Sequence, residues 1–129
     1  MLDRLFDTKS FLSARYALDG LSARQAAIAD NVANVNTPNY KRQEVPFEGA
    51  LTSAVERALN PAAEQPGGAA PAFQPLTMRD TATVGRADGN NVDIESEMVG
   101  LAENTLRYQA LTQYVGGTFQ DLKAVINSK

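Results

Sequence analysis

Apolar residues recur every three or four positions between residues 11 and 35. The positions on this stripe are Phe11, Ala14, Leu18, Leu21, Gln25, Ile28, Val32 and Val35. Because alternating steps of three and four return to one side of a helix, the pattern predicts a helix of roughly 37 Å with a heptad face. Ser10 is a candidate N-cap for this helix. Alanines beside the stripe favour helix formation and allow close approach by more than one neighbour.

The same rhythm returns near the end of the chain. Its positions are Ile94, Met98, Leu101, Thr105, Tyr108, Thr112, Val115, Phe119, Leu122 and Ile126. Asp93 is a candidate N-cap, and Glu95 and Glu97 suit the positive end of a helix dipole. The pattern predicts a second helix of roughly 50 Å. Within it, Gly116 and Gly117 mark a bend or a close contact with another chain, because glycine destabilises a helix interior.

The middle of the chain changes character twice. Turn formers and two prolines precede residue 48, which predicts an ordered extended loop, and residues 48–59 have the pattern of a short amphipathic helix. Residues 60–91 then gather proline and glycine with few large apolar side chains. Such a composition cannot pack a core by itself. The stretch 73–84 is expected to be either a short β segment or mobile.

The sequence therefore predicts a mainly α fold in which two long terminal helices form a coiled-coil-like pair. Both helices belong to one assembly domain. The expected boundaries are 1–35 for the N-terminal helix, 36–59 for the loop and short helix, 60–91 for the flexible middle segment, and 92–129 for the C-terminal helix.

Composition narrows the function classes. A chain of 129 residues with 12 basic and 15 acidic side chains has room for about one domain and no broad positive field for nucleic acid. The absence of histidine and cysteine removes imidazole bases, thiolate nucleophiles and the usual zinc ligands, so no catalytic site and no cofactor are expected. No apolar run reaches the ~20 residues of a membrane span, and the N-terminus lacks the pattern of a cleavable signal.

Two groups of polar and charged residues are candidate binding sites. The oxygen-bearing residues Asp88, Asn90, Asp93, Glu95 and Glu97 lack the spacing of a calcium loop, so helix capping is the favoured role. The basic residues Lys41, Arg42 and Arg57 are too sparse for a nucleic-acid patch and are expected to form solvated or intersubunit ion pairs.

The helices can pair within one molecule as a hairpin, or they can pack against copies in an assembly. Each is much longer than the ~12 residues of an average globular helix, and little chain remains to cover the other faces. Burial by neighbouring subunits is therefore favoured, and head-to-tail contacts between identical copies produce a filament or tube. A soluble coiled-coil adaptor remains an alternative, and an enzyme that uses carboxylates alone is a third.

Two motifs add a family resemblance. The run IADNVANVNTPNYKR, from Ile28 to Arg42, resembles the signature shared by flagellar rod and hook proteins. The run from Gly89 to Tyr108 resembles the proximal-rod group of that family. The family usually has glycine where this chain has Asn39, and asparagine is the non-glycine residue that best tolerates positive φ.

The motif also has a physical interpretation. Asn31 and Asn34 lie one turn apart near the end of the first helix, where their amides can bond free carbonyls or the following loop. Thr37 and Pro38 would stop the helix. Tyr40 is expected to pack back against it, with its hydroxyl on a polar partner.

The resemblance implies a structural subunit of the proximal rod, which polymerises through its terminal helices into the drive shaft that crosses the periplasm. It also implies export by the flagellar type III apparatus without a cleaved signal peptide. The implied partners are copies of itself, other rod proteins and the adaptor to the membrane ring, with no nucleic acid and no membrane span. The residues assigned to the assembly interface are Leu18, Leu21, Ile28, Asn31, Val32, Asn34, Thr37, Pro38, Tyr40, Met98, Leu101, Tyr108, Val115, Phe119 and Leu122.

Overall fold

The computed structural model describes residues 9–60 and 73–127, and the prediction of a mainly α fold with long terminal helices is confirmed. Its elements are α2 (Lys9–Ala33), β1 (Gln43–Glu44), α3 (Glu48–Leu59), β2 (Met78–Arg79) and α4 (Ile94–Asn127). Expectations that fall on residues 1–8, 61–72 and 128–129 lie outside the described residues.

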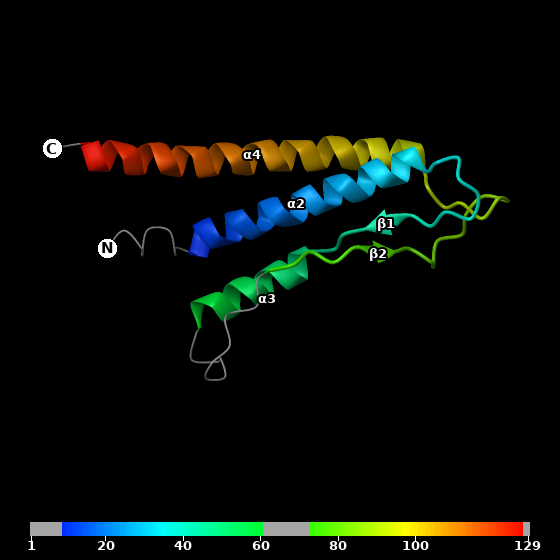
Figure 1. The fold of residues 1–129 in the computed structure, drawn as a ribbon, viewed down its shortest axis with the longest axis horizontal. Helices are drawn as coiled ribbons and strands as arrows, with labels where there is room; N and C mark the ends of the chain where they lie inside the picture. Colours follow the sequence, from blue (N-terminus) through cyan, green and yellow to red (C-terminus); the bar gives the residue numbers. More distant parts are fainter. Residues whose placement is uncertain (1–8, 61–72, 128–129) are drawn as a thin grey trace.

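The long helices α2 and α4 lie side by side and antiparallel, with α3 on the other side of α2 (Figure 1). The strands lie near the end of the pair where α2 stops and α4 begins. They are antiparallel, with Gln43 opposite Arg79 and Glu44 opposite Met78. The helices thus pair within one chain as a hairpin, and α3 covers a second face of α2.

The heptad stripe of α2 faces inward, as its spacing predicts. Ala14, Leu21 and Ile28 are buried on it. The helix already includes Lys9 and Ser10, so the prediction of Ser10 as the N-cap is wrong, because a cap residue lies outside the helical backbone.

Helix α3 closes an apolar core against α2. The core consists of Leu21, Ala27, Val45, Phe47, Ala54 and Phe73. Phe73 brings the chain back to this core: its ring stacks on Tyr16 at 5.2 Å and meets Phe47 edge-on at 6.5 Å. The guanidinium of Arg24 lies 4.5 Å from the centre of the Phe47 ring and donates a hydrogen bond of 2.8 Å to the Val45 carbonyl. These contacts attach α3 and the residues before it to the middle of α2.

The side of α4 that meets α2 is rotated from the predicted stripe. Its buried and half-buried residues are Glu97, Gly100, Leu101, Asn104, Leu111, Val115, Thr118 and Leu122. Met98, Thr105 and Thr112 of the predicted stripe are exposed instead. Glu97 and Asn104 occupy the seam because each finds hydrogen-bond partners on α2, which offsets the cost of burying a polar group.

Gly116 and Gly117 lie in an uninterrupted stretch of α4, and apart from the neighbouring backbone of that helix no described atom lies within 4 Å of a Cβ built at either. They therefore make no close contact within the chain. Gly20 of α2 differs, because a Cβ there would overlap the ring of Phe47. This glycine sets how closely the loop before α3 approaches α2.

Because Gly20 is closely packed and Gly116 is not, adding a methyl group should have opposite effects on stability at the two positions. Gly20→Ala is expected to lower the free energy of unfolding by about 1–3 kcal/mol, because Phe47 must move. Gly116→Ala is expected to raise it by about 0.5–1 kcal/mol through helix propensity alone. Urea unfolding followed by circular dichroism measures both. A Gly20→Ala protein as stable as the Gly116→Ala protein would contradict the close packing described here.

Candidate assembly interface

The turn after α2 is held by residues of the run from Ile28 to Arg42. The Asn34 side chain donates to the Asp30 carbonyl at 2.8 Å, and its amide oxygen accepts from the Thr37 hydroxyl at 3.1 Å. Asn39 has φ 61°, so this position does require the left-handed region in which asparagine replaces the usual glycine. Gly89, with φ 80°, packs directly against the Asn39 side chain. The predicted roles of Asn34 and Asn39 in the turn are confirmed.

Asn31, in the last turns of α2, is fully buried and uses both ends of its amide. Its Nδ2 donates to the Gln43 carbonyl at 2.9 Å and to Glu97 Oε2 at 3.1 Å. Its Oδ1 accepts from the Gln43 amide at 2.7 Å and from the Tyr40 hydroxyl at 3.3 Å. Tyr40 therefore packs back against the helix with its hydroxyl on a polar partner, as the motif predicts.

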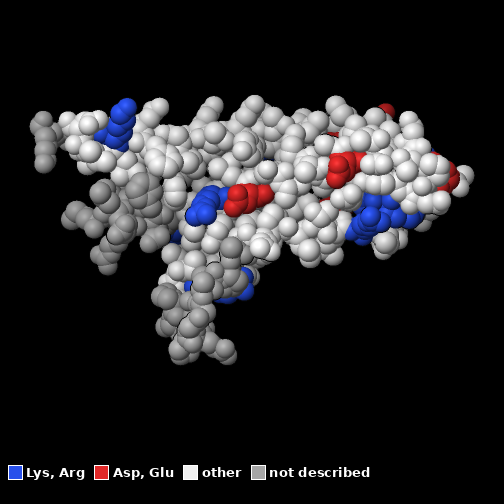
Figure 2. All heavy atoms as spheres, viewed as in Figure 1, with Lys and Arg blue, Asp and Glu red and all other residues white. Residues whose placement is uncertain are grey.

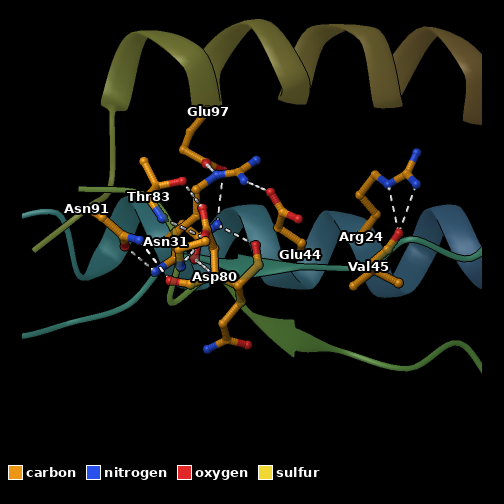
Figure 3. A network of polar contacts seen from close by, with 11 residues as sticks. Arg24, Asn31, Glu44, Val45, Asp80, Thr83, Asn91 and Glu97 are labelled. Carbon is orange, nitrogen blue, oxygen red and sulfur yellow. Dashed lines mark hydrogen bonds and ion pairs between the residues drawn. The ribbon is translucent and has the colours of Figure 1, made fainter. Parts of the chain in front are cut away.

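Glu97 enters this arrangement from α4, pointing toward Asn31 between the two long helices (Figure 3). Its side chain is buried, and Oε1 accepts a hydrogen bond from Arg42 Nε. Arg42 also pairs with Glu44. Burial alone would lower the pKa of Arg42, but the hydrogen bond and negative charge of Glu97, helped by Glu44, raise it. Helix capping is thus the wrong role for Glu97, and the prediction of a solvated or intersubunit pair for Arg42 is also wrong, because the two residues pair inside the subunit.

Two asparagines before α4 complete the arrangement. Asn90 is fully buried, and its Nδ2 lies 2.8–3.2 Å from three carbonyls, those of Asn34, Val35 and Thr37. Asn91 accepts from the Arg42 amide at 2.6 Å and donates to the Asp80 carbonyl at 2.8 Å. We call Asn31, Arg42, Asn90, Asn91 and Glu97 the polar junction.

The polar junction joins the end of α2, the loop that follows it and the residues before α4. Asn90 and Asn91 belong to the segment expected to be flexible. Helix capping, the role favoured for the group that includes Asn90, is wrong for this residue, because its amide nitrogen binds the turn after α2. The residues from Phe73 onward in that segment make specific contacts, including the short strand β2. The only available signal was the run GNNVD before α4, in which Asp93 caps the helix through a 3.1 Å bond from the Glu95 amide, as predicted.

The residues predicted for the assembly interface divide by exposure. Leu21, Ile28, Asn31 and Leu122 are buried within the chain. The half-buried members are Leu18, Val32, Asn34, Tyr40, Leu101 and Val115, and the exposed ones are Thr37, Pro38, Met98, Tyr108 and Phe119. The structure gathers Asn31, Asn34 and Tyr40 at the polar junction and distributes the apolar members along the helix pair. Their contacts with a neighbour stay a prediction.

One side of the helix pair is left open. A hollow of about 520 Å³ there is lined by Ser22, Gln25, Ala26, Ala29, Thr105, Tyr108 and Gln109. Met98 lies two turns before Thr105 on the same face of α4 and is half exposed. We call these eight residues the open flank. None of these eight residues carries a charge. On the face of the molecule shown in Figure 2, the charged side chains form small, separate groups.

Similar proteins identify the family. A family model described as flagella basal body rod protein matches residues 11–41, which cover most of α2 and the following turn. A protein of Borrelia hermsii named flagellar basal body rod protein FlgB is 39% identical, over 95% of this chain and 98% of its own length. The chain belongs to the FlgB family of flagellar basal body rod proteins.

Other FlgB proteins match over similar lengths. The Bacillus subtilis protein is 33% identical over 85% of this chain and 87% of its own length, and the Escherichia coli protein is 26% identical over 99% of each. The family resemblance seen in the two motifs is confirmed. Within residues 9–60 and 73–127, none of the helices combines the length and apolar character that crossing a membrane requires.

Asn90 provides a direct test of the polar junction. Asn90→Ala would leave buried carbonyls with fewer donors, so we expect the free energy of unfolding to fall by about 1–3 kcal/mol. Asn36→Ala, at an exposed position in the same turn, is expected to change it by less than about 0.5 kcal/mol. Urea unfolding of both variants measures the difference. Equal midpoints would show that Asn90 does not hold the junction together.

Proposed function

We propose that this structural subunit of the flagellar basal body rod polymerises through its α2–α4 pair, with the open flank as a contact surface between subunits. The observation that carries the proposal is an uncharged surface beside a 34-residue helix, on which Met98 and Tyr108 are 50% and 43% exposed. Large apolar side chains in a contiguous exposed patch are typical of protein–protein contacts.

The energetics favour association. Each Å² of apolar surface removed from water contributes roughly 25 cal/mol, so a long flank gains most when a helix of similar length covers it. The α2 side of the flank has small side chains, those of Ser22, Ala26 and Ala29, which allow the backbone of another helix to approach closely. Repeated contacts of this kind along one axis produce a shaft in which many helices share a twisting load.

The finer assignments follow from the family. We place the subunit in the proximal rod, which crosses the periplasm, and we infer export through the flagellar type III apparatus without a cleaved signal peptide. Its neighbours in this proposal are copies of itself, other rod proteins and the adaptor to the membrane ring. The FlgB relatives support this placement because they match nearly the whole chain rather than one helix.

A charge on the open flank tests the proposal. Met98→Lys is expected to abolish rod assembly and swimming, because the contact would bury an unpaired ammonium group, while the free energy of unfolding of the isolated chain changes by less than about 0.5 kcal/mol. Ala50→Lys, on the exposed side of α3, serves as the control and is expected to support swimming. Electron microscopy of basal bodies and spreading in soft agar measure the two outcomes.

A strain that lacks the gene defines the baseline of this experiment. Basal bodies without a rod are expected there, and the unmodified gene should restore them. Complete rods in the deletion strain would refute the proposed function. Normal rods with Met98→Lys would instead refute the use of the open flank.

A further inference from the structure

The opposite side of the helix pair carries a second concave surface. Two adjoining hollows, of about 290 and 460 Å³, lie between α4 and the β1–α3 region and share Glu48 and Arg107 in their linings. We call this surface the α3-side groove. Its apolar end is lined by Leu21, Phe47, Leu51 and Leu111, and its polar end by residues that include Arg24, Glu97, Glu103 and Asn104.

Asn104 leaves one atom without a partner at this groove. The residue is only 3% exposed, and Nδ2 donates to the Leu21 carbonyl at 3.0 Å and to Gln25 Oε1 at 2.7 Å. Asn104 lines the groove and not the open flank, whereas Gln25, which accepts from its Nδ2, lines the flank. From this we infer that Oδ1 lies on the side of the groove. Oδ1 is buried and accepts no hydrogen bond from the described residues. A buried acceptor in this state is stabilised by any donor that reaches it.

Each charged residue named in the groove has a partner of opposite charge, with Glu103 the most loosely paired, 3.9 Å from Arg107. Arg24 pairs with Glu48 at 2.7 Å, and Arg42 pairs with Glu97. Burial alone would raise the pKa of Glu48, but the hydrogen bond from Arg24 and its positive charge lower it, which favours the ionised carboxylate. An uncharged partner can therefore cover the groove without leaving a buried charge unpaired.

The open flank supplies such a partner surface. It has no charged residue, and its largest side chain, Tyr108, offers an apolar ring with a hydroxyl that makes no hydrogen bond within the described part of the chain. A tyrosine in this state is suited to an interface, because the ring fills an apolar hollow while the hydroxyl donates to an acceptor.

We propose that the open flank of one copy packs on the α3-side groove of a second copy, and that the Tyr108 hydroxyl donates to Asn104 Oδ1 across the contact. This inference rests on the proposed function and specifies the two surfaces that meet. Because the surfaces differ, the contact is heterologous: each copy retains one free flank and one free groove, and subunits add without closing into a dimer.

Cysteine cross-linking tests which surfaces meet. The chain has no cysteine, so Glu103→Cys at the groove and Gln109→Cys on the flank each introduce a single thiol. The two full-length variants, one with a peptide tag that makes the mixed product distinguishable, are co-expressed in the deletion strain and oxidised. The mixed disulfide is expected to exceed both symmetric products. A dominant Gln109–Gln109 product, or no cross-link in rods that assemble normally, would overturn the proposal.

Removal of one hydroxyl tests the hydrogen bond. Tyr108→Phe is expected to weaken self-association of the purified chain roughly three- to tenfold, the effect of one hydrogen bond. Tyr114→Phe, at a similarly exposed position on another face of α4, is the control and is expected to leave it unchanged. Sedimentation velocity over a concentration series measures both. Equal self-association of the two variants would overturn the bond between Tyr108 and Asn104.

The two levels of the proposal fail separately. If the deletion strain forms rods, the proposed function is wrong. Suppose instead that the deletion strain lacks rods and that the two cysteine variants restore rods without the mixed disulfide. The protein is then a rod subunit, and the pairing of flank with groove is wrong.

Discussion

Burial of the Glu97 carboxylate between the two long helices is the constraint on which the rest of the structure depends. A carboxylate removed from water needs a positive partner and hydrogen-bond donors, or the fold does not tolerate it. Arg42 and Asn31 meet that need, and they come from the loop after α2 and from α2 itself. Asn91 in turn fixes the backbone at Arg42. One buried carboxylate thereby joins the end of α2, the loop after it and the first turn of α4.

The register of the helix pair follows from the same polar positions. Asn104, two turns after Glu97, binds the backbone of α2 at Leu21, so the seam is set by one charged and one amide side chain as well as by apolar packing. Polar residues in a helix seam often specify one arrangement at some cost in stability. Here they turn part of the predicted apolar stripe of α4 outward, where Met98 and Tyr108 become available to neighbours.

Local chemistry was predictable from the sequence, and long-range pairing was not. The spacing of apolar residues located both helices, and the chemistry of asparagine and tyrosine identified the positive φ of Asn39 and the contact of Tyr40 with Asn31. The rotation of α4 could not be predicted, because Glu97 and Asn104 resemble solvent-facing residues until their partners are known. Residues 73–91 resemble a flexible chain because amide-to-carbonyl hydrogen bonds, and few apolar contacts, hold them in place.

The position of Phe73 bears on where the chain can accept insertions or deletions. The chain leaves the described structure at Asn60, at the end of α3, and re-enters at Phe73, whose ring packs in the same core as Phe47 and Ala54 of that region. Asn60 and Phe73 thus both lie on the α3 side of α2. Insertions or deletions between them would leave the helix pair in register, so this stretch is the natural place for relatives to diverge in size and for a fluorescent or affinity label to be added.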